Sequence, residues 1–365
     1  GLEHLDDRYL RAVGYATKAK SRGRPKMVLI ADIVSDDENA VGEAASQVVR
    51  LANARAGEGF IAVTPEARKK FWLDRSRTAA IARHTNAFKI NEDVVIPLDR
   101  LGDYSDGIER INIELSIANK LKLLDQLAQF FHGSLPVDGS DAPNLSNAEL
   151  LGDRSDAALQ MIEKVRERWQ WIFDNLDAAF EMYLTGYPGA PLEKDLAQEE
   201  TPQSVFHALR DFVLRVSWKR EVLAELEQLF SGKTDQPIIK AVTAIHQKVL
   251  RGRAFVALHM HAGDGNVHTN LPVNSDDYEM LQTAHKAVAR IMELARGLNG
   301  VISGEHGIGI TKLEFLQEDE ISPFVDYKKR IDPNGHFNKG KLLPGADLRN
   351  AYTPSFELLG VESLI

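Results

Sequence analysis

Apolar positions recur with two different spacings along the chain, and they divide it into regions. Residues 27–34 read M-V-L-I-A-D-I-V, a nearly continuous apolar run that is typical of a buried strand. Ser35 and Glu38 then have the spacing of a capping box, which predicts an amphipathic helix as far as Ala56. G-E-G-F-I-A-V at 57–63 predicts a turn followed by a second strand.

Two further elements complete this first layer. Thr64-Pro65-Glu66 predicts a helix start, because proline is favoured at the first helical position. E-D-V-V-I-P at 92–97 predicts a third short strand that proline ends. We therefore expect residues 26–100 to form a β-α-β-α-β layer with helices over the sheet, preceded by an N-terminal helical segment at 1–25.

Helical spacing replaces this pattern from residue 101 to residue 252. D-G-I-E-R-I-N-I-E-L-S-I-A-N-K-L-K-L-L-D-Q-L is long and periodic at the helical repeat, and two or three more helices follow it. The stretch is expected to be an all-helical insertion. Trp169, Trp171 and Trp218 are interpreted as aromatics of its core or of an interface.

The sheet is expected to resume at 253–345. A-F-V-A-L-H-M-H alternates like a strand, the polar residues at 274–277 cap a helix that reaches about Arg296, and G-V-I-S at 300–303 predicts another strand. Residues 346–365 form a tail or linker. The fold class that follows is α+β: a ferredoxin-like antiparallel sheet covered by helices, with a large all-helical insertion.

Composition narrows the possible partners. The formal charge of -9 and the pI near 5.7 argue against a nucleic-acid partner, which requires a basic face. No run of 18 apolar residues predicts a membrane span, and the first residues do not resemble a signal peptide. The chain has no cysteine, which excludes disulfides and iron–sulfur ligation within it and favours a cytoplasmic location. Any metal must therefore be held by histidines and carboxylates.

The stretch H-A-G-D-G-N-V-H at 261–268 has a histidine at each end. Its glycines allow the chain to reverse, so His261 and His268 can converge on one ion such as Zn²⁺, Mn²⁺ or Fe²⁺. Glu305, at the end of another predicted strand, is the natural third ligand. His259, two residues before His261, could be a fourth ligand, but it is interpreted as a supporting or core histidine. The alternative is that each histidine makes an ordinary hydrogen bond and that the glycines only serve a tight turn.

Three other residues could take part in chemistry. His306 adjoins Glu305 and can act as a general base, or it can be an ordinary histidine on a surface loop. Arg75, in F-W-L-D-R, can clamp a carboxylate with two parallel hydrogen bonds, or it can be a solvated charge on a helix. The same two interpretations apply to Lys89.

Three motifs together carry a family resemblance. H-A-G-D-G-N-V-H is followed by G-V-I-S-G-E-H-G-I-G and then by K-K-R-I-D-P-N-G-H-F-N-K-G-K, in that order. The combination resembles the C-terminal domain of FAD-linked oxidases of the vanillyl-alcohol-oxidase type, which include the D-lactate, glycolate and D-2-hydroxyglutarate dehydrogenases. The resemblance covers residues 250–345 and extends weakly to 26–100.

The resemblance implies a role for each site residue. It assigns a divalent metal (Zn, Mn or Fe) to His261, His268 and Glu305. His306 is the implied base, and the implied substrate contacts are Arg75, Lys89 and Asn270; the implied flavin contacts are Asn266, Asn338 and Lys341. The chain departs from the family in reading N-K-G-K where N-P-G-K is usual, and in having Ala79 where a threonine is expected.

The implied function is oxidation of a D-2-hydroxy acid, with the Cα hydride passing to the N5 atom of FAD. No glycine-rich pyrophosphate loop precedes residue 250. The expected partners are therefore a flavin-binding domain of the same polypeptide and an iron–sulfur module downstream, and the isolated chain is expected to be inactive. Two alternatives remain: a metal-dependent hydrolase that uses the same ligands, and a non-catalytic assembly module that docks through the helices of 101–252.

Overall fold

The computed structural model describes residues 1–12, 25–75, 88–138, 146–190, 192–193, 200–309, 312–338 and 342–343. The chain divides into two compact units, one made of Gly1–Ser105 with Val256–Ile365 and the other of Asp106–Phe255. The first unit contains a sheet with helices, and the second is helical. The helical insertion predicted at 101–252 falls largely on the second unit.

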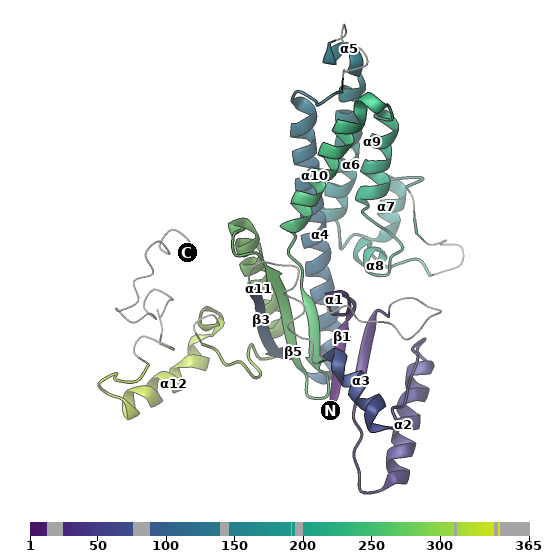
Figure 1. The fold of residues 1–365 in the computed structure, drawn as a ribbon. Helices are drawn as coiled ribbons and strands as arrows, with labels where there is room; N and C mark the ends of the chain where they lie inside the picture. The colour runs from purple at the N-terminus through teal and green to yellow at the C-terminus, as the bar shows by residue number, and fades with distance from the viewer. Residues whose placement is uncertain are drawn as a thin grey trace. The chain divides into compact units, whose positions relative to one another are not determined.

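The first unit is built on a five-stranded sheet in which all neighbouring strands are antiparallel (Figure 1). The strand order is β2 (Met27–Ala31), β1 (Leu2–Asp6), β4 (Ala257–His261), β5 (Asn266–Val273) and β3 (Phe88–Val95). Segments that lie far apart in the sequence thus meet in one sheet, because β1 pairs with β4. The predicted α+β class is confirmed.

Alternation along β4 and β5 decides which face of the sheet carries polar groups. His259 and His261 alternate with Leu258 and Met260 along β4, and the register sets His259 opposite His268 of β5. Paired residues of antiparallel strands direct their side chains to the same face. The three histidines therefore share one face of the sheet.

Helices accompany this sheet: α1 (Asp7–Ala12), α2 (Glu38–Asn53), α3 (Pro65–Arg75), α11 (Tyr278–Gly297) and α12 (Glu318–Ile331). α11 packs against β3 and β5. It begins where the side chain of Asp277 accepts the N–H of Met280, and it buries an apolar stripe of Met280, Ala284, Ala287, Val288, Ile291, Met292 and Ala295. The helix predicted to reach about Arg296 is thus confirmed.

The prediction of helix for residues 1–25 is wrong at its start. Leu2–Asp6 is a strand between β2 and β4, and only Asp7–Ala12 is helical in the described part of this segment. The alternation of buried and half-buried residues in L-E-H-L-D agrees with a strand. Pairing with strands that lie far away in the sequence outweighs the local helical preference.

Other strand predictions also differ from the structure. Residues 57–63 form no strand, and Phe60 and Val63 are 60% and 86% exposed. G-V-I-S makes an isolated bridge, between Val301 and Val95, instead of a strand. The strand predicted at 92–97 begins earlier, at Phe88, and α2 is capped by Asp37 instead of Ser35. The helix start at Pro65 is confirmed.

The second unit is a set of helices around an apolar core. α4 (Leu101–His132) starts in the first unit, and α5 (Asn147–Leu151), α6 (Arg154–Asp174), α7 (Phe180–Gly186), α8 (Val205–Arg210), a π-helical turn (Lys219–Leu223), α9 (Ala224–Leu229) and α10 (Gln236–Arg251) follow. Short 3-10 turns lie at Leu98–Arg100, Lys233–Asp235 and Leu313–Phe315. The tail predicted at 346–365 lies outside the described residues.

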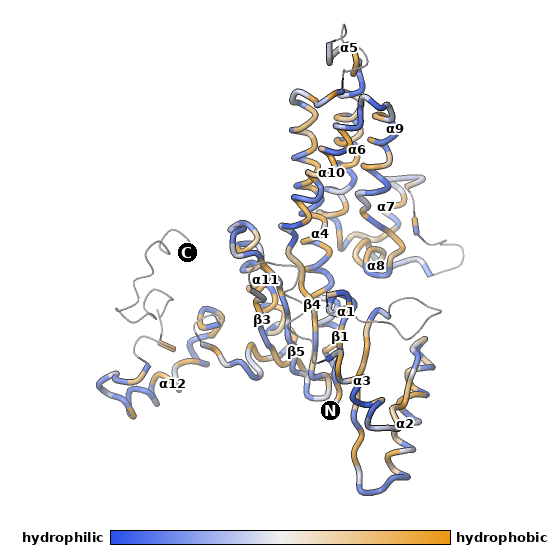
Figure 2. The backbone as a smooth tube through the Cα atoms, in the orientation of Figure 1, coloured by the Kyte–Doolittle hydropathy of each residue, from blue (hydrophilic) through white to orange (hydrophobic). Residues whose placement is uncertain are grey.

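Hydrophobic and hydrophilic positions alternate along α10 and the neighbouring helices, as Figure 2 shows. The apolar positions meet in a core that includes Trp169, Phe180 and Trp218, while Trp171 packs beside Tyr183. The expectation that the tryptophans are core aromatics is confirmed. Across the described residues, no helix is both long enough and apolar enough to cross a membrane.

Candidate metal centre

The hairpin that joins β4 to β5 brings His261 and His268 together. The turn depends on Gly265, whose φ is 82° and whose added Cβ would lie 2.1 Å from the carbonyl oxygen of Ile96. Only glycine adopts this conformation without strain and allows the contact. The two imidazoles meet edge to face, with ring centroids 5.2 Å apart. The predicted chain reversal is therefore present.

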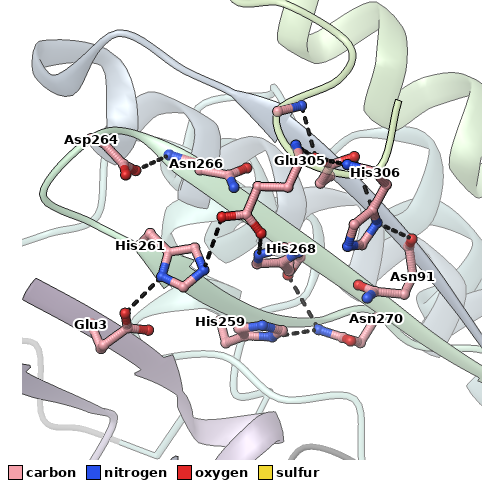
Figure 3. A network of polar contacts seen from close by, with 12 residues as sticks. Glu3, Asn91, His259, His261, Asp264, Asn266, His268, Asn270, Glu305 and His306 are labelled. Carbon is pink, nitrogen blue, oxygen red and sulfur yellow. Dashed lines mark hydrogen bonds and ion pairs between the residues drawn. The ribbon is translucent and has the colours of Figure 1, made fainter. Parts of the chain in front are cut away.

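Glu305 reaches the two histidines from the loop that follows Ile302 (Figure 3). Its Oε1 lies 3.5 Å from Nε2 of His261, and its Oε2 lies 3.5 Å from Nε2 of His268. One ligand atom from each residue lies within 4.8 Å of the others. Among the residues that the structure describes, this is the group of histidines and carboxylates with the geometry of a metal site.

The chemical state of the two histidines fits a divalent metal. Nδ1 of His261 donates to Oε1 of Glu3 at 2.6 Å, which leaves the Nε2 lone pair directed to the cluster. Burial, together with the nearby His261 and His306, lowers the pKa of His268 to about 4, so its imidazole is neutral at neutral pH. Imidazole nitrogens and a carboxylate are ligands that suit Zn²⁺, Mn²⁺ or Fe²⁺.

His306 lies beside the cluster with one ring nitrogen fixed by the backbone. Its Nδ1 donates to the carbonyl oxygen of Asn91 at 3.2 Å, because a carbonyl can only accept. The neutral ring then carries its lone pair on Nε2. The centroids of the His306 and His268 rings are 5.2 Å apart. This tautomer can accept a proton from a group held at the cluster.

A buried layer supports His268 from behind. The His259 ring stacks on the His268 ring, with centroids 4.4 Å apart and planes 14° apart. Asn270 is fully buried, and its Nδ2 donates to Nδ1 of His259 and to the carbonyl oxygens of Ala257 and His268. His259 is therefore a supporting histidine in this arrangement. The Nδ2 of Asn270 is thus occupied within the same buried layer.

Arg75 is joined to the cluster through Glu3. Its Nε donates to Oε2 of Glu3 at 2.6 Å, while Oε1 of the same carboxylate accepts from His261. The Arg75 side chain is only 17% exposed, so it is not a solvated helix charge. The structure therefore brings Arg75 close to His261, because Glu3 of β1 binds both side chains.

Two of the three residues expected to contact flavin have described side chains, Asn266 and Asn338. Asn266 is buried, and its Oδ1 would lie 2.4 Å from a Cβ added to Gly304, so it packs tightly beneath the Glu305 loop. Asn338 is exposed with a φ of 46°. Lys341 and the side chain of Lys89 lie outside the described residues, as does Ala79; the Lys89 backbone pairs with Pro272.

Sequence analysis missed three residues that organise the site: Glu3, Asp93 and Lys312. Asp93 is fully buried on β3, and Lys312 lies against it. Burial alone would raise the pKa of Asp93, but hydrogen bonds from Lys312 and from backbone N–H groups outweigh it and hold the pKa well below its usual range. The available signal was an acid within the apolar run E-D-V-V-I-P.

Comparisons with known proteins identify a family for the chain. Residues 1–129 and 196–342 match the family model described as "FAD linked oxidases, C-terminal domain". The glycolate oxidase subunit GlcD of Escherichia coli K12 is 38% identical over 93 residues, which cover 24% of this chain and 19% of that protein.

Two other relatives align with this chain over stretches of similar length. The mitochondrial D-lactate dehydrogenase [cytochrome] of Arabidopsis thaliana is 33% identical over 88 residues, which cover 23% of this chain and 16% of that protein. The D-2-hydroxyglutarate dehydrogenase of Stutzerimonas stutzeri is 35% identical over 89 residues, which cover 23% of this chain and 19% of that protein. The aligned stretches thus span less than a fifth of each relative.

Proposed function

Because the chain belongs to the family of FAD linked oxidases through their C-terminal domain, we propose that it forms the substrate- and metal-binding part of an FAD-dependent 2-hydroxy acid dehydrogenase. The three relatives act, by their names, on glycolate, D-lactate and D-2-hydroxyglutarate. These compounds share a carboxylate next to a carbon that bears a hydroxyl group. The proposed substrate is a D-2-hydroxy acid of this kind.

The observation that carries the proposal is the convergence of His261, His268 and Glu305 next to the free ring nitrogen of His306. The three residues would hold a divalent metal ion. When bound, the ion acts as a Lewis acid that lowers the pKa of a substrate hydroxyl group and fixes its position. Glu305 is 55% exposed, so the cluster is open on the side from which a substrate must enter.

His306 is the proposed general base. Its Nε2 accepts the hydroxyl proton, and the hydrogen bond from Nδ1 to the Asn91 carbonyl keeps the ring in the required tautomer. The resulting imidazolium is stabilised by Asp93, whose Oδ1 lies 3.6 Å from Nδ1. The same side chain can later release the proton to solvent, since it is 38% exposed.

Arg75 is the proposed clamp for the substrate carboxylate. A guanidinium has five N–H donors, and the bond from Nε to Glu3 uses one of them. Glu3 thereby sets the position of both Arg75 and His261, which we assign to the carboxylate end and the hydroxyl end of the substrate. Asn270, buried behind His268, is assigned a supporting role instead of a substrate contact.

The flavin is proposed to be held by the remainder of the protein. Its chemistry is to accept the hydride that leaves the substrate Cα. This chain positions the substrate and removes the proton, and it is expected not to turn over any 2-hydroxy acid alone.

The experiment is anaerobic reduction of the flavin by substrate, in the protein that carries this chain together with its flavin. D-Lactate, glycolate and D-2-hydroxyglutarate are mixed with it, and loss of the visible flavin absorbance is followed in time. At least one compound should bleach the flavin, and His306→Gln should slow bleaching by about 100-fold or more. His285→Gln is the control, because His285 is an exposed histidine of α11 that pairs with Glu314.

Two results would contradict the proposal. One is bleaching at the wild-type rate in His306→Gln. The other is hydrolysis of an ester or amide by the metal-loaded chain without flavin, together with no flavin reduction by any of the three acids, which would favour a metal-dependent hydrolase.

A further inference from the structure

Asp93 binds the loop that carries both Glu305 and His306. One carboxylate oxygen, Oδ2, accepts the backbone N–H groups of Gly304, Glu305 and His306, with distances of 2.8 Å and 3.0 Å to the first and last. Three successive N–H groups that converge on one oxygen form an anion-binding nest. The conformation of this loop is therefore defined by a single buried side chain.

Lys312 completes the arrangement from the other end of the same loop. Its Nζ donates to Oδ1 of Asp93 at 2.5 Å and to the Asp93 carbonyl oxygen at 2.8 Å, and it lies 3.4 Å from Glu92. The side chain is 2% exposed. A carboxylate can be buried at low cost only when a charge and hydrogen bonds compensate it, and Lys312 supplies the charge.

The position of Asp93 links the two sources of metal ligands. In the sheet register Asp93 is paired with His268, so the residue that holds the Glu305 loop lies directly beside a histidine of the hairpin. Residues 302–309 of the loop contain no helix or strand, and Glu305 extends from it with a mostly exposed side chain. The loop's main polar attachment to the sheet, among the described residues, is to Asp93 and Asn91 of β3.

We propose that Asp93 and Lys312 are positioning residues that hold Glu305 and His306 over the His261–His268 hairpin. The proposal rests on the proposed function, because it takes the cluster to be a metal site. Neither residue touches the ion or the substrate. Asp93 fixes the backbone from which the carboxylate ligand and the base extend, and Lys312 makes the buried charge of Asp93 tolerable.

The test compares Asp93→Asn with the double variant Asp93→Asn/Lys312→Met. In the single variant the asparagine side chain has the shape of the aspartate, but Lys312 is left buried without the carboxylate of Asp93. The variant therefore loses stability, and the loop loses the carboxylate that accepts its N–H groups. The double variant removes both charges, which should restore much of the stability while the loop keeps only a weaker amide acceptor. Asp332→Asn is the matched control, because Asp332 accepts the N–H groups of His336 and Phe337 in another loop.

Two readouts are needed for each variant: the Zn²⁺ affinity of the chain by competition with a chelating dye, and amide hydrogen exchange at residues 304–306 in metal-free protein. We expect Zn²⁺ affinity about 10- to 100-fold weaker in both Asp93 variants, as for other residues that orient metal ligands. Amide protection at 304–306 should be lost in both. Asp332→Asn should match wild type in affinity and at these amides.

The outcomes separate this proposal from the proposed function. Full recovery of Zn²⁺ affinity in the double variant, in step with its stability, would mean that Asp93 and Lys312 only stabilise the fold, and would overturn the inference. Unchanged exchange at 304–306 in Asp93→Asn would overturn it as well. If wild type binds no metal ion, the proposed metal site is wrong. The exchange measurement still decides whether Asp93 holds the loop.

Discussion

The two halves of the candidate metal centre are held in place by different means. The hairpin half, His261 and His268, belongs to strands whose backbone register fixes it, and the His268 side chain is 5% exposed. The loop half, Glu305 and His306, has no regular structure, and the Glu305 side chain is 55% exposed. Sheet pairing builds the first half, and one buried carboxylate with its lysine builds the second. The second half is therefore the one that a single substitution can displace.

Two buried aspartates that accept backbone N–H groups differ in charge because their surroundings differ. Asp6, at the end of β1, accepts the N–H groups of Tyr9 and Leu258 and so ties β1 to β4. Burial raises the pKa of Asp6 to about 7, since these hydrogen bonds and Arg8 offset only part of the cost. Asp93 has Lys312 beside it and keeps a pKa below its usual range. The hairpin side thus carries a carboxyl that is partly protonated near neutral pH, and the loop side a carboxylate.

Removing one candidate ligand from each half should separate the two halves in metal-free protein. His268→Ala should lower the free energy of unfolding by about 1–3 kcal/mol, because a buried ring that stacks on His259 is lost. Glu305→Ala should change it by no more than about 0.5 kcal/mol, as is usual for an exposed side chain. Urea denaturation of both variants measures the difference. Equal losses would show that the loop half is as well integrated as the hairpin half.

Glu3 offers a way to weaken the hairpin half without touching the loop. Glu3→Gln removes the carboxylate that accepts from Nδ1 of His261, so Zn²⁺ affinity should fall by about tenfold, while amide exchange at 304–306 should stay as in wild type. Glu314→Gln is the control, since Glu314 faces the exposed His285 at 3.8 Å. Loss of protection at 304–306 in Glu3→Gln would show that the two halves are not held independently.

A further difference between the two halves concerns pH. The pKa of Asp6 is raised on folding from 3.8 to about 7, so its protonated form favours the native state. This contribution is fully present below about pH 4 and is lost as the pH rises through 7. Asp6→Asn cannot ionise, so the stability of the variant relative to wild type should increase between pH 4 and pH 8. Urea denaturation across this range measures it, and a constant difference would disprove the assignment.

The sequence predicted the parts of this molecule that depend on local patterns. Helix starts such as Pro65, the strand that ends at His261 and the histidine-bearing turn all follow from spacing and from proline or glycine. The motifs also predicted that His261, His268 and Glu305 converge. An iron–sulfur module downstream and a cytoplasmic location stay predictions.

What could not be predicted depends on contacts between distant parts of the chain. Residues 2–6 become a strand because Glu3 pairs with His261, 258 residues away. Asp93 stands in a short apolar run, and its role follows only from a loop more than 200 residues further along the chain. Nothing near Arg75 in the sequence indicates its partner, and Glu3 of β1 brings it to the site.

The most direct test of the account is the metal content of the chain. Wild type, His268→Ala and the control His285→Ala are purified without chelator, loaded with Zn²⁺, Mn²⁺ or Fe²⁺, desalted and subjected to elemental analysis. The account predicts about one equivalent of metal in wild type and in His285→Ala, and none in His268→Ala. No bound metal in wild type, or an equal amount in His268→Ala, would contradict it.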